Sequence, residues 1–218
     1  MKKKVLLEYI TSIVIAVIAA LIIRALFLQA FRIPTGSMEK TLLVGDFLLV
    51  NKYIYGARIP FTGWHLPKIR DPRQGEVVIF KYPEDPSLDY VKRCIAIGGQ
   101  TVEIKDKKVY VDGELFDNPP HAQFPYDLIP DGVPEPEIYP FDSYFNRDNY
   151  GPFTVPEDHI FVMGDNRDNS QDSRYWGPLP LENMVGKALI IYWSWDYNES
   201  FYKILSKVRW GRIGDIVR

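Results

Sequence analysis

Cysteine and histidine are scarce in this chain of 218 residues, and it has no excess of basic charge. Its single Cys excludes an internal disulfide framework and any zinc site built on paired cysteines. The three His lie in unrelated contexts without the spacing of metal ligands, and no glycine-rich loop that could hold phosphate is present. With 26 basic and 28 acidic residues the net charge is −2, which gives no sign of nucleic-acid binding. We therefore expect no metal, no cofactor and no nucleic-acid partner.

Long apolar runs are scarce too, with one exception at the N-terminus. Residues 9–28 contain one charge, Arg24, and 20 residues suffice to span a bilayer as a helix. A helix buried in a soluble core is an alternative, but the run has no polar stripe. A cleaved signal peptide is another, but Leu28 is bulky where a cleavage motif needs small residues. We predict an uncleaved transmembrane anchor over 9–28. The three lysines at positions 2–4 would keep residues 1–8 cytoplasmic.

The charge distribution also divides the chain in two. Residues 1–32 contain five Lys and Arg against one Glu, a net charge of +4. The remaining residues contain 21 basic and 27 acidic side chains, a net charge of −6. An acidic domain outside the membrane is a poor binder of nucleic acid, whose phosphates demand basic contacts.

Short β-rich segments bounded by turn residues dominate from residue 44 onward. The segments that we expect to be strands are 47–55, 76–82, 90–97, 101–104, 109–111, 159–163 and 187–193. This spacing is typical of an antiparallel sandwich or barrel-like body, so we predict one mainly β extracytoplasmic domain over 32–218. Residues 117–152 are rich in Pro and Asp without periodicity, and we interpret them as a surface insertion. Residues 201–210 are basic and aromatic, and could form a short helix near the membrane surface or a solvated tail.

A turn that presents hydroxyl groups follows the apolar run. Residues 32–42 read Arg-Ile-Pro-Thr-Gly-Ser-Met-Glu-Lys-Thr-Leu. Pro34 and Gly36 favour an irregular backbone, so Ser37 is expected on a turn rather than in a strand, with Thr35 as a second hydroxyl. An ordinary linker turn is the alternative for such a short motif.

A second polar segment, residues 163–177, contains three Asp, two Asn, two Arg and two Ser. Such a density of short polar side chains indicates a loop held by its own hydrogen bonds. A calcium-binding loop is an alternative, but the expected Gly and closing Glu are missing and two Arg would repel a cation. Pairing of Asp with Arg inside the loop is the simpler interpretation.

Lys92 is an unusual lysine because it lies in a strand that otherwise looks buried, 90–97. Strand alternation puts it on the same face as Cys94 and Ala96, with Arg93 on the other face. Burial among small apolar residues would lower the pKa of its amine and leave part of it neutral. A nucleophilic serine needs a base, and without a plausible His a neutral lysine can serve. Cys94 itself is expected to be a buried, inert thiol.

Together these segments resemble the bacterial type I signal peptidases, which are membrane-bound serine proteases with a Ser/Lys dyad. The resemblance covers almost the whole chain. It rests on the N-terminal apolar run and on four blocks in matching order and spacing: Ile-Pro-Thr-Gly-Ser-Met at 33–38, Gly-Asp-Phe-Leu-Leu-Val at 45–50, Val-Lys-Arg at 91–93 and Gly-Asp-Asn-Arg-Asp-Asn-Ser-Gln-Asp-Ser-Arg at 164–174.

The resemblance implies a role for each matching residue. Ser37 would be the nucleophile and Lys92 the general base. Thr35 stands where the family commonly has a Ser whose hydroxyl assists the oxyanion hole, and the backbone N–H of Ser37 would be the second donor.

Further residues would support this site. Ser170 matches a serine that orients the lysine, while Asp172 and Arg174 match a pair that braces the site. Met38 follows the nucleophile as the family pattern requires, and Gly164 opens the last block.

The implied activity is that of a serine endopeptidase. It would remove N-terminal signal peptides from exported preproteins, with small residues at the minus-one and minus-three positions, through an acyl-enzyme and without a metal or cofactor. Its partners would be the preproteins and the lipid bilayer, and we expect it to function as a monomer. It would cross the bacterial plasma (inner) membrane once, with its N-terminus in the cytoplasm and its catalytic domain on the outer face.

Two other functions remain open. The first is a membrane-anchored β-domain that binds partners without catalysis, which would leave the Ser-Lys set unexplained. The second is a different Ser/Lys peptidase, of a pilus-maturation or self-cleaving regulator type. The regulators usually carry a DNA-binding part and an Ala-Gly self-cleavage pair, and we find neither in this sequence.

Overall fold

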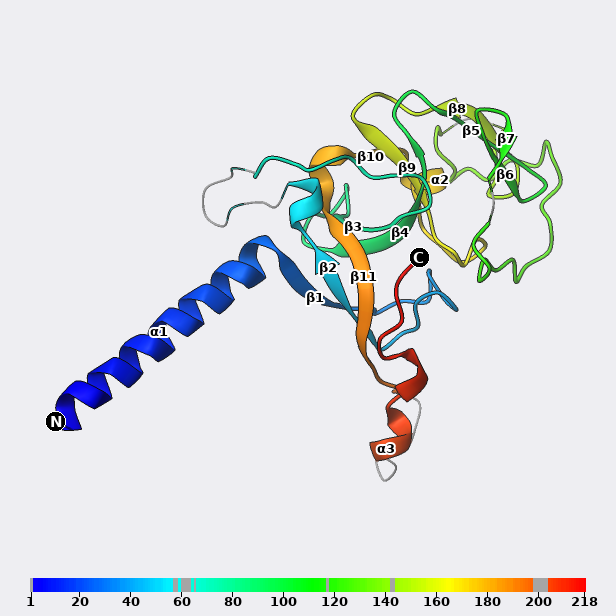
Figure 1. Cartoon of the computed structure of the whole chain (residues 1–218). Helices are drawn as coiled ribbons and strands as arrows, with labels where there is room; N and C mark the ends of the chain where they lie inside the picture. Colours follow the sequence, from blue (N-terminus) through cyan, green and yellow to red (C-terminus); the bar gives the residue numbers. More distant parts are fainter. Residues whose placement is uncertain are drawn as a thin grey trace.

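A long apolar helix, α1 (Lys2–Leu26), opens the chain and projects away from the rest of the molecule (Figure 1). The structure is a computed structural model that describes residues 2–56, 59, 64, 66–116, 118–141, 144–197 and 204–218. In that part of the chain α1 is the one helix long and apolar enough to cross a membrane, and none of its stretch Lys4–Leu21 is buried. The helix ends two residues before the expected span does. Leu28 instead begins strand β1, where its backbone pairs with Asn51.

The body is built around a seven-stranded antiparallel sheet in the order β1-β2-β11-β3-β4-β9-β10. Its strands are β1 (Leu28–Arg32), β2 (Asp46–Asn51), β3 (Val77–Lys81), β4 (Asp89–Ile97), β9 (His159–Met163), β10 (Leu179–Pro180) and β11 (Met184–Ser194). Irregularities in the pairing of β11 and β4 interrupt the regular ladder, and bulges of this kind bend strands. The sheet accordingly curls (Figure 1).

A smaller antiparallel sheet has the order β7-β6-β5-β8. Its strands are β5 (Thr101–Lys105), β6 (Lys108–Val111), β7 (Glu114–Leu115) and β8 (Tyr150–Thr154). Residues 150–152 of the expected insertion therefore belong to a strand that pairs with β5. Gly151 has φ +83°, and a Cβ there would lie 2.4 Å from the Val102 carbonyl oxygen, so only glycine fits this crossing.

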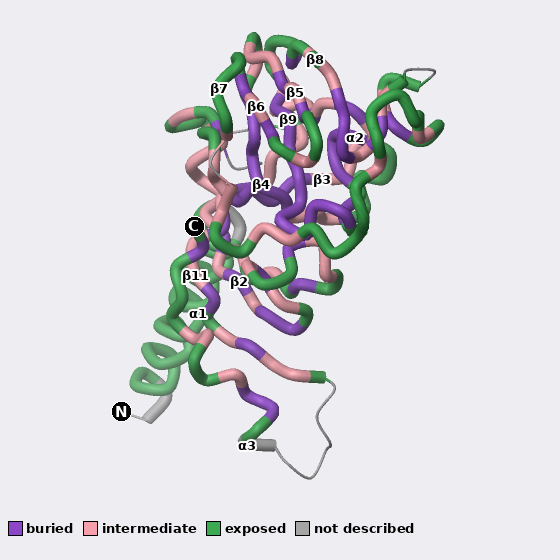
Figure 2. The backbone as a smooth tube through the Cα atoms, turned by 90° about the vertical axis from the view of Figure 1, so that its right-hand side faces the viewer, coloured by how far each residue is buried: buried purple, intermediate pink, exposed green. Residues whose placement is uncertain are grey.

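Two apolar clusters fix the position of the site. One joins β4 and β9 to the smaller sheet through residues such as Ile95, Val102 and Phe161. The other packs the segment after β1 against β2, β3 and β11, and it includes Ile33 and Met38. Figure 2 shows the buried backbone concentrated in the central strands, whereas α1 is exposed along its described length.

The mainly β fold with one N-terminal apolar helix is confirmed. Each expected strand lies within or overlaps an observed one, and 101–104 and 109–111 form the expected hairpin. The differences are at 53–55, which forms the 3₁₀ helix η1 (Tyr53–Tyr55), and at β1, β7, β8 and β10, which were not among the expected strands.

The short elements α2 (Ser173–Trp176), α3 (Ile204–Lys207), η2 (Leu181–Asn183) and η3 (Trp210–Arg212) complete the chain. The C-terminal segment expected to be a helix or a tail contains α3, although its residues 201–203 lie outside the described part. Val208 bridges to Trp195 and is 7% exposed, so this end of the chain packs back onto the body.

Candidate active site

The turn after β1 is tied to the body at both ends. The Ile33 N–H donates to the Asp46 carbonyl and the Gly45 N–H donates to the Ile33 carbonyl, at 2.9 and 3.1 Å. Met38 is 1% exposed and packs in the cluster with Ile33. A buried side chain directly after Ser37 thus fixes the turn, while Ser37 itself lines a cavity.

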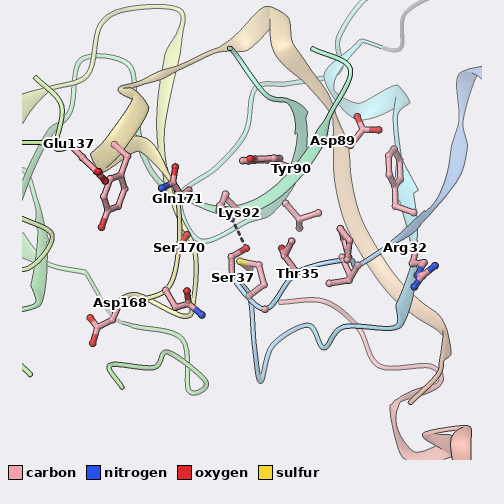
Figure 3. A pocket seen from close by; sticks show the side chains of 18 of the residues that line it. Arg32, Thr35, Ser37, Asp89, Tyr90, Lys92, Glu137, Asp168, Ser170 and Gln171 are labelled. Carbon is pink, nitrogen blue, oxygen red and sulfur yellow. Dashed lines mark hydrogen bonds between the residues drawn. The ribbon is translucent and has the colours of Figure 1, made fainter. Parts of the chain in front are cut away.

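Lys92 reaches the same point from the central strand β4. Its backbone pairs with Val78 of β3, and its Nζ lies 2.6 Å from the Ser37 Oγ (Figure 3). These two residues are 55 positions apart in the sequence. The structure therefore brings the two expected dyad residues into direct hydrogen-bond contact.

Burial governs the protonation of Lys92, whose side chain is 3% exposed. Desolvation lowers the pKa of Lys92 to about 8, because the charged ammonium loses its hydration. The Asp172 charge opposes this lowering of the pKa, the Arg174 charge adds to it, and Asp165 opposes it. An appreciable fraction of the amine is thus neutral at mildly alkaline pH, where an ordinary lysine would be fully charged.

The polar loop, residues 163–177, contains a buried ion pair whose charges act on Lys92. Asp172 and Arg174 are 0% and 1% exposed, and the Arg174 Nε donates to an Asp172 carboxylate oxygen at 2.9 Å. The same carboxylate accepts from the Gly164 N–H, and Arg174 also donates to the Arg147 carbonyl. Burial is the largest single influence and would raise the pKa of Asp172, but the Arg174 charge, the hydrogen bonds from Arg174 and the Gly164 N–H, and the Lys92 charge together outweigh it and lower that pKa. The expected pairing of Asp with Arg inside the loop is present here.

A second buried ion pair crosses from the loop to β4, which the sequence did not indicate. Asp165 accepts from the Arg93 Nε and Nη2 at 2.8 and 2.6 Å, and from the Thr41 hydroxyl at 2.6 Å. Arg93 follows Lys92 directly, so the ion pair fixes the strand position next to the lysine. Its partners are 72 residues apart, and no local pattern connects them.

Gly164 allows the loop to approach the turn closely. A Cβ at this position would lie 2.3 Å from the Ser170 Oγ and 2.5 Å from the Ser37 carbonyl oxygen. Ser170 is 6% exposed and lines the same cavity as Ser37. Its hydroxyl has no hydrogen-bond partner among the described residues, so the structure places it beside the dyad without a bond to Lys92.

The cavity has a volume of about 740 Å³ and collects residues from four parts of the chain. The turn contributes Thr35 and Ser37, and β4 contributes Lys92 with its neighbours Tyr90 and Val91. The expected insertion contributes Glu135 to Glu137, which sequence reasoning missed because no motif surrounds them. The remaining lining residues come from the end of β1 and from the polar loop, including Asp168, Ser170 and Gln171 (Figure 3).

A buried amine in contact with a hydroxyl at a cavity wall is the pattern of a nucleophile with its base. Thr35 adds a hydroxyl on the same wall, and no hydrogen bond within the described residues occupies it. In that part of the chain, no three His, Cys, Asp or Glu side chains are grouped so that they could hold a metal ion.

Comparison with known proteins agrees on one family. The family model of the signal peptidases, peptidase S26, matches residues 6–193. A signal peptidase I of Pseudomonas fluorescens is 38% identical over 212 residues, covering 89% of this chain and 75% of the relative. A signal peptidase I of Aquifex aeolicus is 37% identical over 227 residues, covering 86% and 84%. A solved signal peptidase I from Enterococcus faecalis is 26% identical, with a TM-score of 0.39 over 55% of this chain and 98% of that one.

Proposed function

Because the chain belongs to the signal peptidase family of peptidases, S26, we propose that it is a membrane-anchored serine endopeptidase that cleaves signal peptides by a Ser37–Lys92 dyad. The observation that carries the mechanism is the 2.6 Å contact between the Lys92 Nζ and the Ser37 Oγ on the cavity wall. In this contact the Ser37 hydroxyl lies against an amine whose pKa is lowered by burial. A non-catalytic binding domain would not need a buried amine with a lowered pKa in contact with a serine hydroxyl.

The reaction begins when neutral Lys92 accepts the Ser37 proton and the Ser37 Oγ attacks the carbonyl carbon of the scissile peptide bond. The resulting tetrahedral intermediate collapses as Lys92 returns the proton to the leaving amine. The mature chain departs and the signal peptide stays on Ser37 as an ester. A water molecule, deprotonated by Lys92, then attacks the ester, and the proton returns to Ser37.

The oxyanion forms next to the turn. The Ser37 N–H and the Thr35 hydroxyl are the two donors that would stabilise it, and each such donor contributes about 3 kcal/mol to the transition state. Asp172 with Arg174, and Asp165 with Arg93, hold the loop and β4 so that these groups keep their positions. Ser170, buried beside Ser37, would orient the lysine amine, and Gly164 permits that closeness.

The position of the membrane helix supports both the proposed substrate and the proposed side of the membrane. α1 runs into β1, and β1 runs directly into the turn with Ser37, so the cleavage site lies close to the end of the membrane helix. A signal peptide emerging from the bilayer would meet the cavity there, and its small residues at minus one and minus three would fit beside Val91 and Ile33. The lysines before the span would keep the N-terminus cytoplasmic and residues 32–218 on the outer face of the plasma membrane.

The test is cleavage of a preprotein by the detergent-solubilised full chain. The wild-type protein should release the signal peptide, whereas Ser37→Ala should release none while keeping the wild-type unfolding transition. Ser87→Ala, at an exposed turn residue that does not line the cavity, serves as the matched control and should cleave normally. Normal cleavage by Ser37→Ala would overturn the dyad, and no cleavage by the wild type would overturn the activity.

A further inference from the structure

The two ends of the cavity differ in charge (Figure 3). At the end next to β1, Arg32 lies 4.5 Å over the Tyr197 ring and Asp89 is paired with Lys81 at 2.9 Å. Glu137 and Asp168 lie at the other end, with the dyad between the two ends, and Glu135, two residues before Glu137, also lines the cavity. Charges at the first end already have partners, so any strong electrostatic preference of the cavity comes from the second.

Some of the acidic charge at the second end is balanced within the protein. Lys107 pairs with Asp168 at 2.8 Å and with Asp148 at 3.7 Å. Arg147 lies 3.4 Å from Asp148 and 3.9 Å from Asp168. Two cations thus balance two aspartates in this group.

The two glutamates are not balanced. Glu135 accepts only from the backbone N–H of Arg147, and Glu137 makes no side-chain hydrogen bond or ion pair with any residue that the structure describes. Both line the cavity. This end therefore presents two uncompensated carboxylates to whatever occupies it.

Asp168 adds buried negative charge to this end but is already paired. It is 7% exposed and lines the cavity, and its Oδ2 accepts from the Lys107 Nζ and the Tyr126 N–H, both at 2.8 Å. The carboxylates left without a counter-charge at this end are therefore those of the two glutamates. An ammonium or guanidinium group would supply them with both a hydrogen-bond donor and a counter-charge.

The anchor defines which part of a substrate reaches this end. The step rests on the proposed function, in which the apolar part of the signal peptide lies in the membrane beside α1. The substrate then enters at the end that β1 and Arg32 form, passes Ser37, and leaves past Glu137. The acidic end then faces residues that follow the scissile bond, which an extended chain spaces about 3.3 Å apart.

We infer that Glu135 and Glu137 form a subsite that selects Lys or Arg among the first residues of the mature chain. The subsite is a specificity determinant and takes no part in bond cleavage. It would favour preproteins with a basic mature N-terminus over those with an acidic one.

The experiment uses the full chain in detergent and a set of preproteins that share one signal peptide. Lys, Gln or Glu is placed in turn at each of the first five or so positions after the scissile bond, and kcat/KM is measured. At one or two positions, Lys should be cleaved about three- to tenfold more efficiently than Glu at about 0.05 M salt, and the ratio should fall towards one at about 0.5 M. Equal rates for Lys and Glu at every position would overturn the inference while leaving the proposed function intact.

Variants assign the preference to the named carboxylates. Glu135→Gln combined with Glu137→Gln should bring the ratio of Lys to Glu close to one, and Glu137→Lys should invert it. If the double variant fails to fold, Glu137→Gln alone suffices, because no hydrogen bond in the described structure depends on that side chain. Glu114→Gln, in β7 away from the cavity, is the matched control and should keep the wild-type ratio. A ratio unchanged in Glu137→Gln and Glu137→Lys would contradict the assignment.

Discussion

The buried Lys92 should lower the free energy of unfolding at neutral pH, and replacing it by Met should raise that free energy again. Burial lowers the pKa of Lys92 from its ordinary 10.5 to about 8. At about 1.4 kcal/mol per pKa unit, charging the buried amine is disfavoured by about 3 kcal/mol relative to the unfolded chain. Met keeps the length and apolar character of the side chain but loses the hydrogen bond to Ser37, worth about 1 kcal/mol. Lys92→Met should therefore unfold with a free energy about 2 kcal/mol higher than the wild type near pH 7.

The stability difference between Lys92→Met and the wild type should decrease as the pH rises. Below about pH 8 the lysine is charged in both states and the full penalty applies. Between about pH 8 and 10.5 the unfolded state holds more protons, so the wild-type protein gains stability as the pH rises. The difference in the free energy of unfolding between Lys92→Met and the wild type should decrease by about 2 to 3 kcal/mol between about pH 7 and pH 10.

The assay is urea unfolding of the full chain in detergent, followed by Trp fluorescence. Comparing the two proteins at each pH cancels the titration of all other groups. A difference in the free energy of unfolding that stays constant from about pH 7 to pH 10 would refute the argument that Lys92 is a desolvated amine.

Three further substitutions test the groups around the dyad. Gly164→Ala should destabilise the protein by about 1 to 3 kcal/mol and lower kcat, because its Cβ would overlap Ser170; normal thermal stability and kcat would contradict the close approach. Asp172→Asn should cost about 3 to 5 kcal/mol in chemical unfolding, because Arg174 would stay buried without its counter-charge; a loss under 1 kcal/mol would argue against the ion pair. Thr35→Val should reduce kcat about 10²-fold with little change in stability, whereas Thr35→Ser should keep most activity; equal activity of Val and Ser variants would exclude the hydroxyl from the oxyanion hole.

Much of the fold could be predicted from local patterns. Alternation and turn residues located β2 to β6, β9 and β11 because each carries its own periodic signal. β8 was missed because it contains Gly151 and Pro152, residues that are normally excluded from strand interiors. β1 was missed because its first residue, Leu28, continues the apolar run of the helix and only a partner strand distinguishes them.

The two central residues of the site could be predicted from the sequence, whereas several of the residues around them could not. Ser37 and Lys92 stand out locally, one on a Pro-Gly turn and the other in an apolar strand, and the structure brings them together. The pairing of Arg93 with Asp165 depends on how β4 packs against a distant loop, which no single-chain pattern encodes. Glu135 and Glu137 reach the cavity only because their segment folds back over it, so their charges looked like ordinary surface charges.

The pH dependence of kcat/KM for preprotein cleavage by the full chain tests the central claim most directly. If Lys92 is the general base, kcat/KM should rise with pH and level off with an inflection near the pKa of about 8 that burial imposes on this amine. Lys92→Arg, which cannot be neutral in this range, should show no activity at any pH. A wild-type inflection near the value of about 10.4 of an exposed lysine, or substantial activity of Lys92→Arg, would contradict the Ser37–Lys92 mechanism.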